Sequence, residues 1–476
     1  MYSRSHNVVA QIYKSEQSQR SHHRSDMEDE THTKRMRISE TSFDSVTNMA
    51  EKESWSDYLK TLYPHFRDGD CFMDERQHTY YVTGNKYPVS VSGVWGVFFE
   101  DFDADTIASK VVTNAERDGL KHIESSVYNL MLYLVLCERV DQASFECATR
   151  IERALEGVEA WLHRRGDACE FPFDSVRSEI ARVRKGPTLT KPTQRPCYFL
   201  LYCLGVTADD VKRLWAMHGD MESFKGTFFH KQVELFLQAV GKRQLEIGAS
   251  FIPLASFLNQ EDARRDLRIA ASAPRTMRAL VSVVSRDLWD HPSVQKFLQS
   301  QLEEGVSKEF LQFEAWASSR SDLSPFRSEW SIYDEEFVIA GQIDSLWFDT
   351  TCGNAIVMAD WKRTPKLLSP DVELQQSQVF NNRRGLTTSV HSARNGPCAH
   401  LYDCPYNHYL CQQNLYAYVL ERRYDIKDLK IYLVQCHPDR GGNDTDFTEI
   451  ELPYDPRFAF DLLDAFQDGW GKICVL

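Results

Sequence analysis

The chain has no apolar run long enough to span a membrane. Its longest candidate, Val127 to Cys137, falls well short of the ~20 residues that a membrane helix needs, and it suits a buried helix. The N-terminus also lacks the apolar core of a signal peptide. These two absences predict a soluble, intracellular protein without a membrane-spanning segment.

The 12 cysteines are scattered, and no two of them form a Cys-x-x-Cys pair of the kind that zinc and iron–sulfur sites use. Residues 391–411 hold several histidines and cysteines at irregular spacing: His391, Cys398, His400, Cys404, His408 and Cys411. We therefore expect reduced thiols, with neither a structural zinc ion nor an iron–sulfur cluster.

Basic residues are fewer than acidic ones, which gives the 476-residue chain a net charge of −14. This balance argues against a protein that coats nucleic acid, and it predicts that any DNA-binding surface is a confined basic groove. With 42% hydrophobic and 26% charged residues, the composition is that of a globular protein with about two or three domains.

Composition divides the chain into five segments. A polar, charge-rich start predicts a disordered tail over 1–54. The run Lys34-Arg35-Met36-Arg37 is either a nuclear-import signal or, the interpretation that we favour, a solvated charge run. The other segments are the N-terminal part of a catalytic module (55–115), a helical insert (116–205), the core (206–456) and a C-terminal tail (457–476).

Hydrophobic periodicity predicts an α/β fold with a central mixed sheet flanked by helices and an additional N-terminal helical region. The expected elements are a hairpin after His78 with Gly84-Asn85 as its turn, helices over Val91–Phe99 and Phe102–Val112, two helices within Thr207–Val240, a hairpin of Arg327–Tyr333 with Phe337–Asp344, a strand over Ala355–Trp361, a weakly patterned connection from Pro365 to Tyr406, a helix over His408–Arg423, and a last strand over Leu429–Gln435.

The chemistry is concentrated where two apolar strands end in carboxylates. Asp360 and Lys362 are two residues apart in a strand and therefore share a face. Asp344 ends the preceding strand, and Glu329 starts the hairpin. Carboxylate oxygens can hold a divalent cation such as Mg²⁺. A neighbouring ammonium can position water or stabilise negative charge during phosphodiester hydrolysis. Other Asp-x-Lys triplets lie in helix-like or loop contexts: Asp210-Val211-Lys212, Asp425-Ile426-Lys427 and Asp428-Leu429-Lys430.

Two helices carry further candidates. His230 and Glu234 are four residues apart and share a helix face, so His230 is either a metal ligand with a supporting carboxylate or a packed histidine. Gln412 and Tyr416 share a face of a later helix, where they would reach a substrate or pack on the sheet. Gly341 would let the backbone bend or a ligand approach closely.

The ordered set Gly226-Thr227-x-x-His230-x-x-x-Glu234, Glu329, Gly341-x-x-Asp344, Asp360-x-Lys362 and Gln412-x-x-x-Tyr416 resembles the PD-(D/E)XK nuclease superfamily. Within it, the RecB-like and Cas4-like exonuclease branch is the most similar. The resemblance covers about Leu204 to Pro438. The segment Tyr87 to Val112 is similar to nuclease-like proteins of large DNA viruses and some eukaryotes.

This resemblance implies a restriction-endonuclease-like core and a Mg²⁺- or Mn²⁺-dependent DNA nuclease. The most favoured activity is an exonuclease of replication, recombination or repair, which would work beside other proteins of those pathways. The alternatives are an endonuclease, an RNA-directed nuclease, or a catalytically silent DNA-binding scaffold.

The family's site residues map onto this chain as follows. His230, Asp344 and Asp360 would bind the metal, Lys362 would orient the attacking water, and Glu329 would assist at the metal or through a bound water. Gln412 and Tyr416 would support the site or contact DNA. Basic residues of the following connection would grip phosphates or carry ordinary surface charge: Arg363, Lys366, Arg383, Arg384 and Arg394.

Overall fold

A computed structural model describes residues 41–50, 57–99, 103–110, 208–353, 355–378, 396–440 and 443–470. Several sequence predictions lie outside these residues: the basic run Lys34–Arg37 with most of the N-terminal tail, the insert 116–205, His391, Arg383, Arg384 and Arg394.

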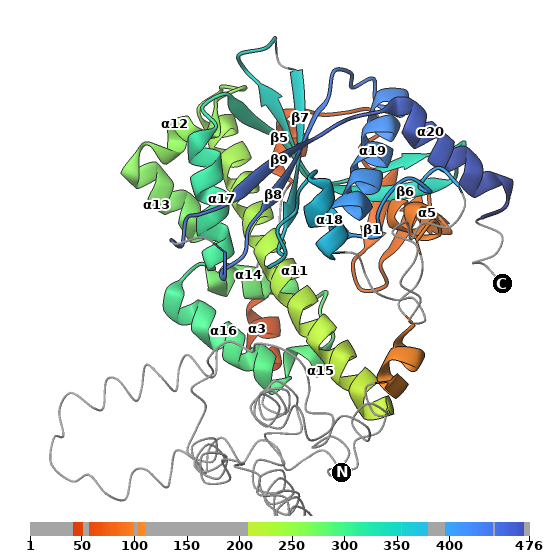
Figure 1. Cartoon of the computed structure of the whole chain (residues 1–476). Helices are drawn as coiled ribbons and strands as arrows, with labels where there is room; N and C mark the ends of the chain where they lie inside the picture. The colour runs from red at the N-terminus through yellow and green to blue at the C-terminus, as the bar shows by residue number, and fades with distance from the viewer. Residues whose placement is uncertain are drawn as a thin grey trace, which may run out of the picture.

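The centre of the molecule is a mixed sheet of six strands (Figure 1). They are β4 (Val89–Ser90), β5 (Leu323–Asp334), β6 (Ile339–Asp349), β7 (Ala355–Lys362), β8 (Lys430–Gln435) and β9 (Thr448–Leu452). β6 is antiparallel to β5 and β7, β8 is parallel to β7, and β9 is antiparallel to β8. β4 runs parallel to the start of β6. The predicted mixed sheet and the β5–β6 hairpin are confirmed.

β7 is apolar because it is covered on both faces, as the buried strands of mixed sheets often are. Met358 packs in the core shared with the later helices, whereas Val357, Ala359 and Trp361 pack in the core shared with the earlier ones. Asp360 and Lys362 therefore follow Met358 on the side of the later helices.

The earlier helices cover one face of the sheet and extend below it (Figure 1). They are α11 (Ala208–Glu246), α12 (Leu254–Leu258), α13 (Glu261–Ala270), α14 (Ala273–Leu280), α15 (Arg286–Trp289), α16 (Pro292–Glu304) and α17 (Lys308–Ser319). In the part of the chain that the structure describes, no helix combines the length and apolar character needed to cross a bilayer.

The prediction of two helices within Thr207–Val240 is wrong, because α11 is one helix of 39 residues. Its first half packs through Phe224 and Phe228 on α14 to α16, and its second half packs through Phe229 and Phe236 against the sheet. Gly226 lies between these halves without ending the helix, since packing on both sides outweighs its low helix propensity.

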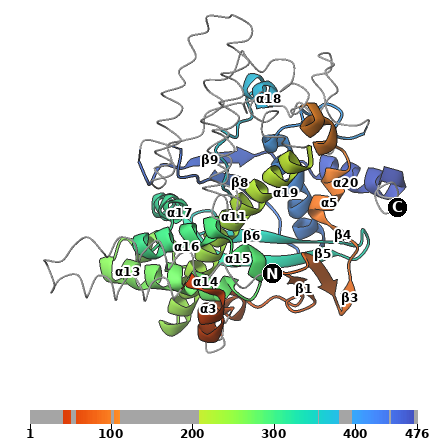
Figure 2. The same ribbon diagram turned by 90° about the horizontal axis from the view of Figure 1, so that it is seen from below.

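The later helices cover the opposite face of the sheet (Figure 2). They are α19 (Pro405–Arg423) and α20 (Pro456–Ala465), joined there by α5 (Val91–Gly96) from the N-terminal part. A short helix, α18 (Val372–Gln378), forms inside the connection predicted to be weakly patterned, and the turn η3 (Phe466–Trp470) follows α20.

A small three-stranded sheet lies beside β5 (Figure 2). It comprises β1 (Cys71–Asp74), β2 (Thr79–Val82) and β3 (Asn85–Lys86), and it follows the short helix α4 (Tyr58–Leu62). The predicted hairpin is confirmed, but its turn is one residue earlier. Thr83 and Gly84 have φ of 48° and 83°, as a tight two-residue hairpin turn requires.

Both chain ends are more structured than the sequence predicts. Near the N-terminus, α3 (Phe43–Ala50) buries Val46, and the Trp289 indole donates to the Thr41 carbonyl at 2.8 Å. Near the C-terminus, β9 adds a strand beyond the predicted last one. The expected tail 457–476 begins instead as α20, whose Leu462 and Leu463 are buried in the core.

Candidate active site

Three carboxylates lie in one row across three neighbouring strands. The register of β5 with β6 sets Glu329 opposite Asp344, and the register of β6 with β7 sets Asp344 beside Asp360. Glu329 has φ of 47°, a left-handed conformation that strand residues avoid. Gln342 stabilises it by donating its side-chain amide to the Glu329 carbonyl at 3.1 Å. Strained residues of this kind are concentrated at functional sites.

His230 approaches this row from α11. Its Nδ1 is 3.6 Å from Asp344 Oδ2 and 3.8 Å from Glu329 Oε1. Phe229 and Val233 on the same helix are buried against the sheet, which fixes the height of His230 above the strands. The ligand atoms of His230, Glu329 and Asp344 all lie within 4.8 Å of one another.

The backbone of Trp361 holds two members of this group. Its N–H donates to Asp344 Oδ2 at 2.9 Å, and its carbonyl lies 3.1 Å from His230 Nε2. The indole packs edge-on against Trp316 and Phe313, at centroid distances of 4.9 and 5.0 Å. A buried aromatic cluster therefore fixes the peptide that orients the site.

Asp360 and Lys362 point toward α19, as their shared strand face predicts. Lys362 Nζ lies 2.6 Å from Asp360 Oδ2 and 4.7 Å from the centroid of the Tyr409 ring. Gln413 donates its side-chain amide to Asp360 Oδ1 at 2.7 Å. Both oxygens of Asp360 are thus engaged by neighbouring side chains.

The site carries more negative charge than its neighbours neutralise. Burial, together with the charge of Asp344, raises the pKa of both Glu329 and Asp360. Burial lowers the pKa of His230, but the charges of Asp344 and Glu329 outweigh it and raise this pKa to about 9. Although burial opposes it, Asp360 and Asp344 likewise raise the pKa of Lys362. A divalent cation would relieve this repulsion.

Tyr416 lies beside this site, in contact with Gly341 of β6. A Cβ atom added to Gly341 would overlap Tyr416 Cε1 and come within 3.0 Å of Val91 Cγ2. The glycine, predicted to permit either a backbone bend or the close approach of a ligand, makes room for the tyrosine ring. Gln412 donates to the Tyr416 hydroxyl at 3.4 Å, so these two residues do support each other.

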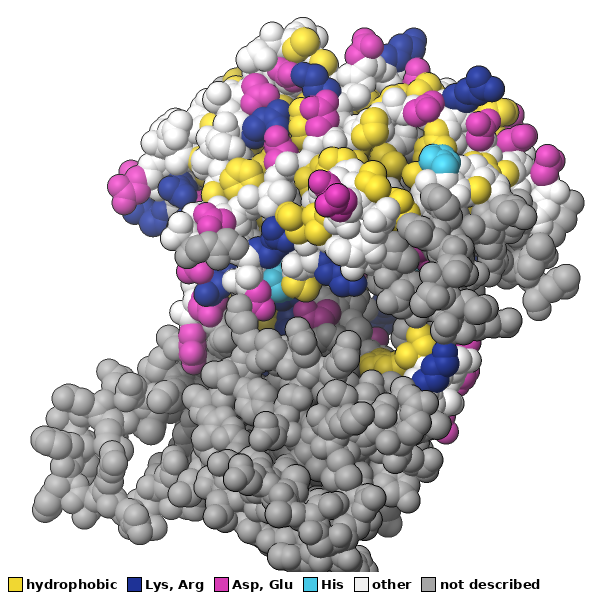
Figure 3. Space-filling view, in the orientation of Figure 1, with side chains coloured by type: hydrophobic (Ala, Val, Ile, Leu, Met, Phe, Trp, Pro, Cys, Tyr) yellow, Lys and Arg dark blue, Asp and Glu magenta, His cyan; other side chains and the backbone are white. Residues whose placement is uncertain are grey.

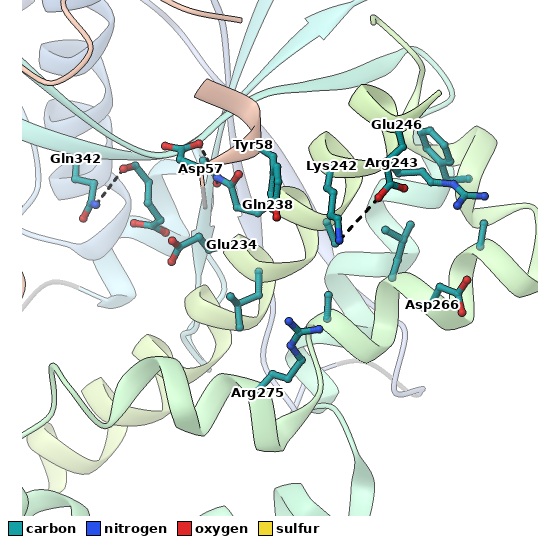
Figure 4. A pocket seen from close by; sticks show the side chains of 18 of the residues that line it. Asp57, Tyr58, Glu234, Gln238, Lys242, Arg243, Glu246, Asp266, Arg275 and Gln342 are labelled. Atoms are coloured by element: carbon teal, nitrogen blue, oxygen red, sulfur yellow. Dashed lines mark hydrogen bonds and ion pairs between the residues drawn. The ribbon is translucent and has the colours of Figure 1, made fainter. Parts of the chain in front are cut away.

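A cavity of about 440 Å³ opens from Glu329 along the second half of α11. Figure 4 shows Glu234 and Gln342 near one end of it and Asp266 near the other. Glu234 forms an ion pair with Lys231 at 2.5 Å, so it does not join the donor atoms around His230. On the face drawn in Figure 3, acidic and basic side chains of the described residues are interspersed.

Arg363, for which a phosphate contact and an ordinary surface charge were both left open, is buried in an ion-pair network. Its side chain is only 8% exposed and forms ion pairs with Glu222 and Glu309. A guanidinium engaged by two carboxylates has few N–H groups left for a substrate. Arg363 instead joins α11, α17 and the end of β7.

The donor atoms that converge fit a divalent cation, although the set differs from the predicted one. Glu329 takes the place of Asp360, whose oxygens are held by Lys362 and Gln413. When Nε2 of His230 donates to the Trp361 carbonyl, the lone pair of Nδ1 faces the carboxylates. Ligating histidines are commonly oriented through their other nitrogen in this way. The carboxylate oxygens suit Mn²⁺ or Mg²⁺, whereas the imidazole suits a transition-metal ion better than it suits Mg²⁺.

Sequence reasoning missed Gln413 and Tyr409, which contact Asp360 and Lys362. Both lie on the helix that carries Gln412 and Tyr416. Gln413 directly follows Gln412, and Tyr409 lies three residues before Gln412. The helical spacing of Tyr409, Gln413 and Tyr416 was a usable signal, because residues three and four apart share a face.

Comparison of the chain with models of protein families, with curated proteins and with solved structures gives no match.

Proposed function

We propose that this chain is a metal-dependent nuclease that hydrolyses phosphodiester bonds of DNA. The observation that carries the proposal is the convergence of His230, Glu329 and Asp344 beside the Asp360–Lys362 pair. The motif order, similar to that of PD-(D/E)XK nucleases of the RecB-like branch, favours a restriction-endonuclease-like core and an exonuclease of replication, recombination or repair.

His230, Glu329 and Asp344 would hold the cation. Their side chains are 27%, 21% and 13% exposed, so an ion and a phosphate can approach them from solvent. A bound Mg²⁺ or Mn²⁺ would supply a Lewis acid that polarises the phosphate. A bound cation would also explain how an acidic site receives a polyanion, because without the cation the carboxylates would repel the phosphate.

Lys362 would stabilise the negative charge that builds up on the phosphate. Asp360 and the face of Tyr409 hold its ammonium in place, and such preorganised charge stabilises a transition state more than mobile charge does. Gln413 keeps Asp360 directed at the lysine. The Trp361 peptide keeps Asp344 and His230 at their separation.

A cleavage assay with purified full-length protein tests the proposal. Labelled linear DNA, circular DNA and RNA are incubated with Mg²⁺, with Mn²⁺ or with a chelator. We expect metal-dependent loss of linear DNA from its ends. Cleavage of circles or of RNA would favour an endonuclease or an RNA-directed enzyme instead.

Variants connect this activity to the site. Asp360→Ala and Lys362→Ala should each lower cleavage by at least ~100-fold. The matched controls are Asp425→Ala and Lys427→Ala, because these residues form the same triplet as an exposed ion pair at 2.8 Å. Full activity in both site variants would reject the proposal.

If no cleavage is measured, the remaining alternative is a catalytically silent scaffold that binds DNA. Calorimetric titration with Mn²⁺ separates the two. If the protein is a nuclease, the wild type should bind Mn²⁺ and the Asp344→Asn variant should not. If it is a scaffold, neither protein should give heat of binding.

A further inference from the structure

An aromatic pair stands on the outer face of the small sheet. Phe72 on β1 is opposite Tyr81 on β2, and their rings are stacked at a centroid distance of 5.1 Å and an interplanar angle of 11°. Strand alternation turns Cys71 and Val82 inward, where they pack on Tyr333. Phe72 points outward and is 55% exposed.

This pair leaves one flat ring surface open. β1 is the first strand of the order β1-β2-β3, so Phe72 has a strand neighbour on only one side of its ring within the described residues. An exposed large aromatic contributes little to folding. A parallel stack, however, presents a surface on which another planar ring can continue.

The hairpin carries charges of both signs, and two of its carboxylates are held by hydrogen bonds. Asp70 accepts from the Tyr333 hydroxyl at 3.1 Å, and Asp74 accepts from the backbone N–H of Arg76 at 3.0 Å. Lys86 on β3 is opposite Tyr81 and exposed, and it forms no ion pair with any residue that the structure describes. It stands one strand spacing, ~5 Å, from Tyr81 and therefore on the Tyr81 side of the stacked pair.

The hairpin borders the candidate active site. Glu75, which follows β1, forms an ion pair at 3.6 Å with Lys231, the residue after His230. Glu75 also lines the cavity that opens from Glu329. A chain that leaves the carboxylate row along this cavity therefore passes Glu75, at the end of the strand that carries Phe72.

We propose that Phe72 and Tyr81 form a stacking platform for an unpaired nucleobase, with Lys86 contacting the adjoining phosphate. This inference rests on the proposed nuclease function, for which it names single-stranded DNA as the bound substrate form. Aromatic side chains combined with a cation bind single strands with little regard to sequence, because every base has a flat face. The stacked bases of a duplex offer no free face.

The test measures binding without cleavage. A fluorescein-labelled oligothymidylate of about 15 nucleotides is titrated with the full-length protein in a chelator, and anisotropy gives the Kd. Phe72→Ala and Tyr81→Ala should each weaken binding by about tenfold or more. Lys86→Gln should lower the slope of log Kd against log salt by ~0.7. Phe460→Ala, at an exposed phenylalanine of α20, should leave binding unchanged.

A second probe reports the stacking itself. An oligonucleotide with a single 2-aminopurine should lose fluorescence when it binds wild-type protein and retain it with Phe72→Ala. Equal Kd values for wild type and both aromatic variants would overturn the platform. So would a lower melting temperature of Phe72→Ala with unchanged binding, since it would mean that the protein itself covers the ring. These binding assays contain no metal, so they do not depend on cleavage. If the protein stacks a base but does not cleave DNA, the proposed nuclease function is rejected and the stacking platform is kept.

Discussion

Nε2 of His230 lies 3.1 Å from the backbone carbonyl of Trp361, the residue between Asp360 and Lys362. The contact links α11 to β7 across 131 residues of sequence. It leaves Nδ1 directed at Asp344 and Glu329. The orientation of the imidazole therefore depends on the same strand that carries the Asp-x-Lys triplet.

His230→Ala should raise the Mn²⁺ concentration for half-maximal cleavage by about 10- to 100-fold, because it removes one ligand while the carboxylates remain. The measurement is cleavage rate against Mn²⁺ concentration. The control is His400→Ala, at an exposed histidine outside the group. An unchanged Mn²⁺ dependence for His230→Ala would exclude it as a ligand.

The adjacent glutamines of α19 should differ in effect. Gln413 is buried and donates to Asp360 at 2.7 Å, whereas Gln412 donates to Tyr416 at a weak 3.4 Å. Gln413→Leu should lower kcat about 10- to 100-fold, as expected for a bond to a charged group. Gln412→Leu should cost less in kcat. Steady-state kinetics on one substrate would decide, and the reverse order would refute this assignment.

Gly341→Ala should lower the free energy of unfolding by about 2 kcal/mol, because the added Cβ overlaps the Tyr416 ring. Much of that penalty should disappear when Tyr416 is also changed to alanine, with a coupling of ~1 kcal/mol in urea denaturation. Gly226→Ala is the control. Its Cβ would meet no atom within 4 Å, so it should be neutral or stabilising. Additive effects at Gly341 and Tyr416 would contradict the proposed contact.

The strands that carry Asp344 and Asp360 were predictable because each is a local apolar run followed by charge. Their convergence with His230 followed only from the family resemblance. Local sequence contains no measure of the distance between α11 and β7. Glu329 was predicted to assist either at the metal or through a bound water. Sequence could not choose between these roles, because the place of Glu329 among the ligand atoms depends on a positive φ that composition does not reveal.

The errors share a physical origin in tertiary packing. Two helices were predicted within Thr207–Val240, but packing at both ends keeps α11 continuous. β9 was missed because only Ile450 and Leu452 of this short strand are buried, which is too few for a clear pattern. The ion pairs of Arg363 could not be predicted, because its acidic partners, Glu222 and Glu309, come from helices far away in sequence.

Glu222 lies at the centre of that ion-pair network and provides a test of it. Although burial opposes ionisation, Lys225 and Arg363 lower the pKa of Glu222 from 4.5 to about 2. A carboxyl group whose pKa is lower in the folded state than in the unfolded state stabilises the fold at any pH above its unfolded-state pKa. This stabilisation disappears as the pH falls through the folded-state pKa.

Glu222→Gln should therefore lower the free energy of unfolding at pH 6 by about 1 kcal/mol, a value reduced for solvent screening because the side chain is 35% exposed. The difference from wild type should shrink as the pH falls from about 4.5 toward about 2, where the wild-type carboxylate also becomes neutral. Urea denaturation across this range measures it. Glu303→Gln, at an exposed glutamate of α16, should differ little from wild type at any pH. A Glu222→Gln penalty that stays constant with pH would mean that its ion pairs contribute nothing and that the loss arises from packing.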